Sequence, residues 1–97
     1  MLFIMPKIEN TGLNEKYSIK LIMHLKRNGP KQISTLTPDV AKNYRTVRNL
    51  VDRLDDDGFL RLNEKTSPRP TIMVELTEEG NKLADELLEI EELMERS

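Results

Sequence analysis

The side chains most capable of chemistry in this sequence are the hydrogen-bond donors between positions 44 and 53. Arg45 and Arg48 carry guanidinium groups, which suit the N7 and O6 acceptors of guanine in the major groove of DNA, and the amide of Asn49 suits adenine. Tyr44 stands beside them and can meet a phosphate or a thymine methyl group. This concentration of long donors predicts a surface that contacts double-stranded DNA.

Catalytic and metal-binding constellations are scarce by comparison. The sequence has one histidine, His24, and no cysteine, so it offers neither a metal site of usual spacing nor a disulfide framework. It has no Cys or His partner for a nucleophile and no Gly-rich phosphate loop. The adjacent carboxylates of Asp55, Asp56 and Asp57 are typical of a solvated helix end. We therefore expect no enzyme activity, no cofactor and no metal.

The donors belong to a predicted helix that begins after Asn43. Its apolar residues recur at offsets of 3, 4 and 7, the period of a helix with one buried face: Val47, Leu50, Val51 and Leu54. Asn43 can cap this helix by accepting a backbone N–H, and Gly58 suits the left-handed residue that follows a helix. Because the donors fall on the opposite face, the helix can lie in the major groove.

Two helices are expected before it. The first spans about residues 14–28 and is ended by a Gly-Pro pair. Residues 31–36 are expected to form the start of the second helix, which then meets Pro38, and a proline inside a helix costs about 3 kcal/mol. Either this helix stops near Thr37, or Thr37 caps a new turn with Pro38 at its first position. We expect a helix that is short or kinked at this point.

Two strands are expected after the donor-bearing helix. Residues 59–62 and 71–76 contain β-branched and apolar residues in rough alternation, and the polar segment 63–70 between them is turn-forming. The two strands therefore predict a β-hairpin. Its tip offers side chains that can donate to phosphate oxygens or enter a minor groove: Lys65, Thr66, Ser67 and Arg69.

A last helix is expected over residues 77–97, with Thr77 as its cap. Its apolar residues follow at spacings of 4, 3 and 4, the rhythm of a coiled-coil seam: Leu83, Leu87, Ile90 and Met94. In a monomer this helix would fold back on its own core. We expect instead that the four residues form a dimer interface against the same helix of a second copy.

Several short motifs in this order resemble the helix-turn-helix of the winged-helix superfamily, and the chain is most similar to MarR-type and PadR-like small bacterial and archaeal transcriptional regulators. The motifs are Ile33-Ser34-x-Leu36, Thr46-Val47, Leu54-x-x-x-Gly58-Phe59-Leu60 and Leu76-Thr77-x-x-Gly80. Ala41 departs from the pattern, because the turn of these proteins usually has Gly there.

The resemblance implies an α+β, mainly α fold, with three helices, a two-stranded wing and a C-terminal dimerisation helix. It also implies a homodimeric, sequence-specific double-stranded DNA-binding protein that regulates transcription. The alternative is a winged helix used as a protein–protein interaction module, whose second helix tends to expose apolar or acidic residues. Ligand-sensing MarR proteins carry extra helices, so no small-molecule effector is indicated here. The residues expected at the DNA are Lys31, Gln32, Asn43, Tyr44, Arg45, Thr46, Arg48, Asn49, Arg53, Lys65, Thr66, Ser67 and Arg69.

Length and charge agree with this expectation. Ninety-seven residues predict one domain, and the resemblance implies a winged-helix domain with an arm over 1–10, a core over 14–76 and a last helix over 77–97. The net charge of −2 conceals a division: residues 1–74 hold 13 Lys/Arg and 8 Asp/Glu, whereas residues 75–97 hold 2 and 9. What matters for DNA is the local field on one face. The apolar start at 1–5 is too short for a membrane span or a signal segment, so a cytoplasmic protein is expected.

Overall fold

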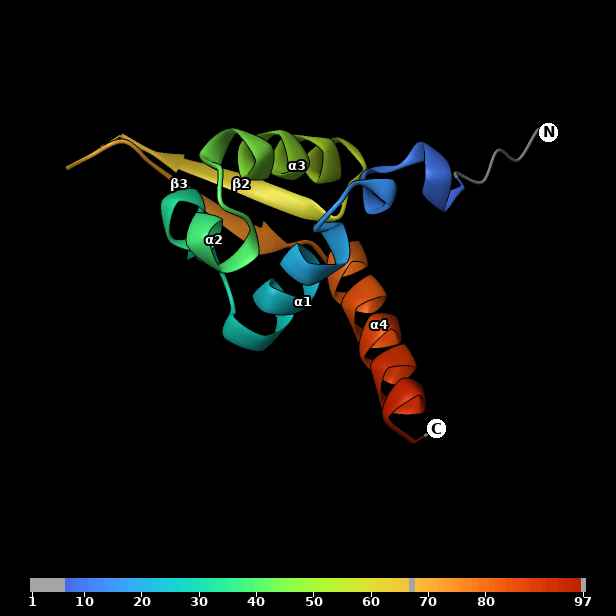
Figure 1. Ribbon diagram of the computed structural model, residues 1–97. Coiled ribbons are helices and arrows are strands. Elements are labelled where there is room, and N and C mark those ends of the chain that lie inside the picture. The colour runs from blue at the N-terminus through green and yellow to red at the C-terminus, as the bar shows by residue number, and fades with distance from the viewer. Residues whose placement is uncertain (1–6, 67, 97) are drawn as a thin grey trace.

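The computed structural model describes residues 7–66 and 68–96. Two 3-10 turns, η1 and η2, lead into four α-helices and three strands (Figure 1). In chain order these elements are η1 (Ile8–Asn10), η2 (Gly12–Asn14), α1 (Ser18–Asn28), β1 (Lys31–Gln32), α2 (Ile33–Val40), α3 (Tyr44–Asp56), β2 (Leu60–Lys65), β3 (Thr71–Leu76) and α4 (Glu78–Arg96). The order of helices and hairpin follows the prediction for a winged helix.

The sheet has three antiparallel strands in the order β1-β3-β2, so the expectation of a two-stranded wing was one strand short. Residues 31 and 32 were expected to start a helix, but they pair with Val74 and Met73 of β3. This pairing satisfies backbone groups along an edge of β3 that would otherwise be open. β2 and β3 pair from Leu60↔Leu76 to Lys65↔Thr71, so β2 starts one residue later than predicted and runs further into the wing.

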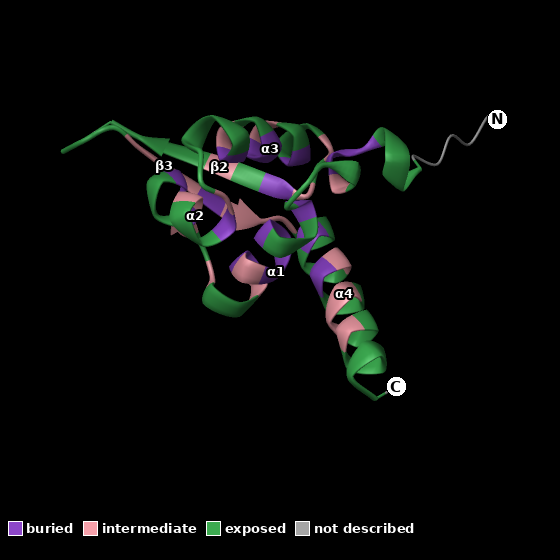
Figure 2. Cartoon of the chain, viewed as in Figure 1, coloured by how far each residue is buried: buried purple, intermediate pink, exposed green. Residues whose placement is uncertain are grey.

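The core lies between α1, α2, α3 and the sheet, and Figure 2 shows buried positions on each of these elements. Helical periodicity explains most of its membership, because each helix contributes one apolar stripe. The buried cluster consists of Leu21, Ile22, Leu25, Ile33, Leu36, Val40, Val47, Leu50, Val51, Leu54, Leu60, Val74 and Ala84.

α3 forms as its local signals predict. Asn43 accepts the backbone N–H of Arg45 at 2.8 Å, which confirms the N-cap. At the other end Gly58 has φ 87°, and the N–H groups of Gly58 and Phe59 donate to Asp55 and Leu54. This paired arrangement closes the helix through a left-handed glycine.

The two earlier helices differ from expectation at their ends. α1 begins at Ser18 rather than near residue 14, because Tyr17 has a left-handed φ of 71° that interrupts the helix before it. α2 does not stop at Thr37, and Thr37 does not cap a new turn. Its hydroxyl donates back to the carbonyl of Ile33 at 2.9 Å, and the helix continues through Pro38 to Val40. Burial of Leu36 and Val40 offsets the cost of the proline.

α4 starts where expected, since Thr77 accepts the N–H of Gly80 at 3.0 Å. Its first turns pack against α1 and β3, and its C-terminal end extends beyond the other elements (Figure 1). Gly80 allows this packing, because a Cβ there would lie 2.1 Å from the carbonyl oxygen of Phe59. Leu83 and Leu87 are partly buried on the core of their own chain, whereas Ile90 and Met94 are exposed. The predicted seam is therefore divided between two environments.

Candidate nucleic-acid interface

The exposed side of α3 has two flanks that face different neighbours. Residues two apart on a helix stand about 200° apart around its axis. Tyr44 and Thr46 therefore point to opposite flanks of α3, and each lines a different surface hollow. We call the side with Tyr44 the wing flank and the side with Thr46 the outer flank.

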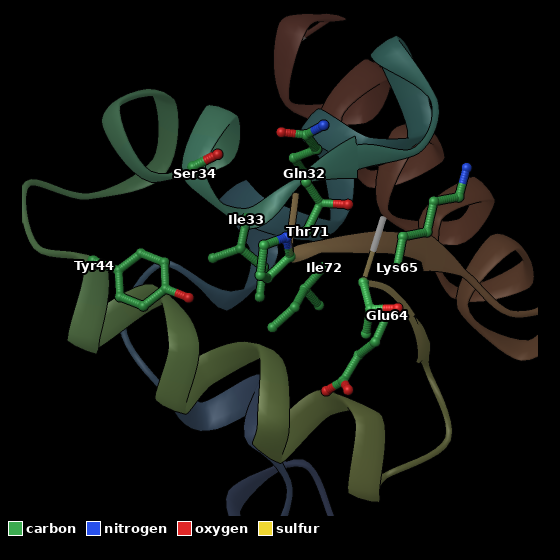
Figure 3. Close-up of a pocket in the computed structure, with 10 residues that line it drawn as sticks. Gln32, Ile33, Ser34, Tyr44, Glu64, Lys65, Thr71 and Ile72 are labelled. Atoms are coloured by element: carbon green, nitrogen blue, oxygen red, sulfur yellow. The ribbon is translucent and has the colours of Figure 1, made fainter. Parts of the chain in front are cut away.

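The wing flank is a hollow between the start of α3, the start of α2 and the hairpin. Figure 3 shows Tyr44 reaching from α3 into this space, with Ser34 on α2 and Thr71 and Ile72 on β3 around it. Four residues predicted to contact DNA are brought together here from three separate parts of the sequence: Gln32, Tyr44, Lys65 and Thr66. Ser34 was not among the predicted residues, although its position at the start of α2 could have suggested it.

Arg48 stands one turn after Tyr44 and forms an ion pair with Asp52, with 3.2 Å between Nε and Oδ2. The side chains of Arg48 and Asp52 are 31% and 48% exposed, so water screens the pair. An exposed pair four residues apart contributes only about 0.3–0.5 kcal/mol. A bidentate contact between an arginine and a base contributes about 1–3 kcal/mol, so Arg48 can exchange its ion pair with Asp52 for a contact with a base.

The outer flank gathers Thr46, Asn49 and Arg53 from α3. Glu15 and Lys16, from the turn before α1, complete this hollow. Lys16 was missed because it lies 30 positions before Thr46 in the chain, and its charge was the one signal present in the sequence. Arg53 also forms a hydrogen bond with the chain before α1, because its Nη2 donates to the carbonyl of Asn10 at 3.1 Å.

The other predicted DNA residues occupy varied positions. Arg45 is exposed on α3, and Asn43 uses its side-chain oxygen to cap that helix. Lys31 is half-buried on β1, and Arg69 is exposed in the wing loop. Ser67 lies outside the described residues.

Two of the three basic residues of α1, Lys26 and Arg27, form ion pairs with carboxylates of α4. The Nζ of Lys26 lies 3.0 Å from Asp85, and the Nη2 of Arg27 lies 2.5 Å from Glu91, both on α4. Within α3, Arg45 and Arg48 occupy the first half, whereas the second half holds three aspartates, Asp52, Asp55 and Asp56, and one basic residue, Arg53. Exposed cationic side chains remain in the first half of α3, at Arg45, and on the wing, at Lys65 and Arg69.

The distal half of α4 presents an apolar groove together with α1. Its lining includes Ile19 and Met23 of α1 and Leu87, Ile90 and Met94 of α4, with Glu91 and Glu95 at its edge. Ile90 is 52% exposed and Met94 is 71% exposed, so part of this apolar lining is in contact with water.

Other classes of site have little support in the part of the chain that the structure describes. Residues 7–66 and 68–96 contain no group of three His, Asp or Glu side chains placed to hold a metal ion. No helix among these residues is long and apolar enough to cross a bilayer.

The helices, the hairpin and their order define a winged helix-turn-helix fold, and comparison with known proteins agrees. No protein-family model matches the chain. A transcriptional regulator homologue from Pyrococcus horikoshii superposes with a TM-score of 0.75 at 15% identity, over 87% of this chain and 85% of that one. BpsR of Bordetella bronchiseptica, whose DNA binding is regulated by 6-hydroxynicotinic acid, gives a TM-score of 0.69 at 20% identity, over 82% of this chain and 56% of its own.

A sequence relative points to the same class. The chain is 27% identical over 65 residues to YfiV of Bacillus subtilis, an uncharacterized HTH-type transcriptional regulator. The match covers 67% of this chain but spans about two fifths (41%) of that relative's length. The chain thus shares its fold with proteins described as transcriptional regulators.

Proposed function

We propose that this protein is a homodimeric, sequence-specific double-stranded DNA-binding protein that regulates transcription. The observation that carries the proposal is the basic, exposed first half of α3, placed beside a hairpin that bears Lys65 and Thr66. Donors of these types suit base edges and phosphate oxygens. The likeness to HTH-type and other transcriptional regulators supports the same assignment.

The division of charge along α3 suggests how the helix meets the groove. Arg45, Arg48 and Asn49 lie in its first half, and Asp52, Asp55 and Asp56 lie in its second half. Aspartates would be repelled by phosphates, so the first half enters the major groove and the second half stays outside. Helix-turn-helix proteins commonly present the N-terminal residues of the second helix to the bases.

The apolar groove between α1 and α4 supports the homodimer. Ile19, Ile90 and Leu93 are exposed around the distal half of α4. Covering them with the same surface of a second copy removes apolar area from water at about 25 cal/mol per Å². The twofold contact would also place two α3 helices for adjacent half-sites of one duplex.

Selection of bound duplexes from a random pool, using the full chain at low salt, tests the whole proposal. We expect enriched sequences with two inverted half-sites, whose centres lie about 10–10.5 base pairs apart or a multiple of that. Binding should weaken steeply as salt rises, because phosphate contacts release counterions. Failure to enrich any sequence, with no salt-dependent binding to random duplex, would contradict DNA binding and favour the protein-interaction alternative.

A further inference from the structure

The outer flank of α3 carries donors suited to the phosphate backbone of DNA, although it lies away from the wing. Lys16 supplies an ammonium group, while Thr46 and Asn49 supply neutral donors in the same hollow. Asn49 connects this hollow to the proposed base-contacting face, because it belongs to both. Glu15 is the single carboxylate among the lining residues.

Hydrogen bonds fix the chain before α1 against α3. The backbone N–H of Gly12 donates to Oδ2 of Asp57 at 2.5 Å, and Arg53 donates to the carbonyl of Asn10. Gly12 is required for this approach, because a Cβ there would lie 2.8 Å from Cγ of Arg53 and 2.9 Å from Cδ2 of Leu54. The segment therefore sits directly on the C-terminal part of α3.

The turn that carries Lys16 is held as well. The buried hydroxyl of Ser18 donates to the carbonyl of Leu13 at 2.7 Å, and Tyr17 takes its left-handed conformation between them. Nζ of Lys16 lies 5.0 Å from the centroid of the Tyr17 ring, and no carboxylate of the described residues lies within ion-pair distance of it. A positioned ammonium without a carboxylate partner is available to an anion outside the protein.

The geometry of duplex DNA supplies that anion on this flank. The major groove is about 12 Å wide, and a helix with its side chains is about 10–12 Å across. A helix that fills the groove therefore has the phosphates of one strand on each flank. The wing flank meets one strand, which leaves the outer flank facing the other.

We propose that Lys16 binds a phosphate of the second DNA strand, so that the turn before α1 forms a contact edge opposite the wing. This inference rests on the proposed DNA binding and deepens it. The two edges together would hold α3 centrally in the groove, which keeps Asn49 within reach of the bases.

Three variants of the full chain test the edge on the duplex selected above. Lys16→Gln should weaken binding to all duplexes and lower the slope of log affinity against log salt by about 0.9, the value for one phosphate. Lys16→Arg should retain the slope. Lys20→Gln is the matched control, because Nζ of Lys20 lies 5.9 Å from the same Tyr17 ring but outside the hollow. It should leave the slope unchanged.

Phosphate ethylation interference assigns the strand. Lys16→Gln should abolish interference at one phosphate, on the strand opposite to the phosphate that Lys65→Ala affects. Three results would each contradict the proposed contact edge. The salt slopes of wild type and Lys16→Gln could be equal, or Lys16→Gln and Lys20→Gln could lose equal affinity. The interference lost in Lys16→Gln could also lie on the same strand as that lost in Lys65→Ala. In all three cases the wild type still binds DNA, so the proposed function survives. Absence of wild-type binding would instead overturn both.

Discussion

α3 and α4 are both amphipathic helices, yet their apolar stripes meet different environments. The stripe of α3 is covered along its whole length, and the elements that contact α3 are α2, β2 and η2. The stripe of α4 is covered only where α1 and β3 reach it, so Leu83 and Leu87 are partly buried and Ile90 is exposed. Periodicity shows that a helix has an apolar face, and the number of surrounding elements decides how much of that face a monomer covers.

The polar faces of α3 and α4 differ in charge. The free face of α3 begins with arginines and an asparagine, which suit nucleic acid, whereas α4 is strongly acidic and repels it. A helix whose apolar stripe is fully buried can offer its polar face to a ligand. A helix with apolar residues left exposed suits a protein partner. The two helices would thus divide DNA contact and dimerisation between them.

The largest effect should come from the buried stripe of α3. Leu54→Ala removes a fully buried side chain, and such changes lower the free energy of unfolding by about 2–5 kcal/mol. Leu93→Ala on α4 is the control, because Leu93 is 63% exposed and should change the stability of the monomer by less than about 0.5 kcal/mol. Urea denaturation at low protein concentration measures both. Similar losses of unfolding free energy in the two variants would mean that the apolar residues of α3 and α4 are not buried to different extents.

The next effect concerns assembly. Ile90→Asp leaves its carboxylate in water in the monomer but buries it unpaired in the proposed dimer, at a cost of several kcal/mol. Light scattering at micromolar concentration should show a dimer for wild type and a monomer for the variant. Asn81→Asp adds the same group at an exposed position of α4 and should remain dimeric. A monomeric wild type would refute the dimer.

A smaller effect is expected in base preference. Arg48→Ala should relax selectivity at one base pair of each half-site by about 1–3 kcal/mol, while non-specific binding is largely kept. The ion pair with Asp52 is too weak to hold Arg48 away from the groove. Competition with singly substituted duplexes measures this change. Equal loss of affinity for every duplex would mean that Arg48 contacts the DNA backbone rather than a base.

The smallest effect is expected at the wing. Lys65→Ala and Arg69→Ala should each weaken binding to all duplexes similarly and make the salt slope about one unit shallower. Affinity measured across a salt series reports the slope. An unchanged slope in both variants would mean that the wing does not touch DNA, and α3 alone would carry the binding.

The elements that the sequence determined are those whose signals are local. The helical period of Val47, Leu50 and Val51, the cap at Asn43 and the stop at Gly58 all lie within 16 residues, so α3 forms where expected. β3 likewise matches residues 71–76. These signals act through nearby backbone hydrogen bonds and one-sided burial, which depend on few distant contacts.

Tertiary structure decided the features that depend on distant partners. β1 exists because residues 31 and 32 find the edge of β3, some forty positions later in the chain. α2 continues through Pro38 because burial of Leu36 and Val40 in the core offsets the cost of the proline. α1 starts late because Tyr17 turns the chain toward the end of α3. The approach of Lys16 to Asn49 and the division of the α4 seam arise in the same way. No local pattern encodes such proximities, because they come from packing between segments far apart in the sequence.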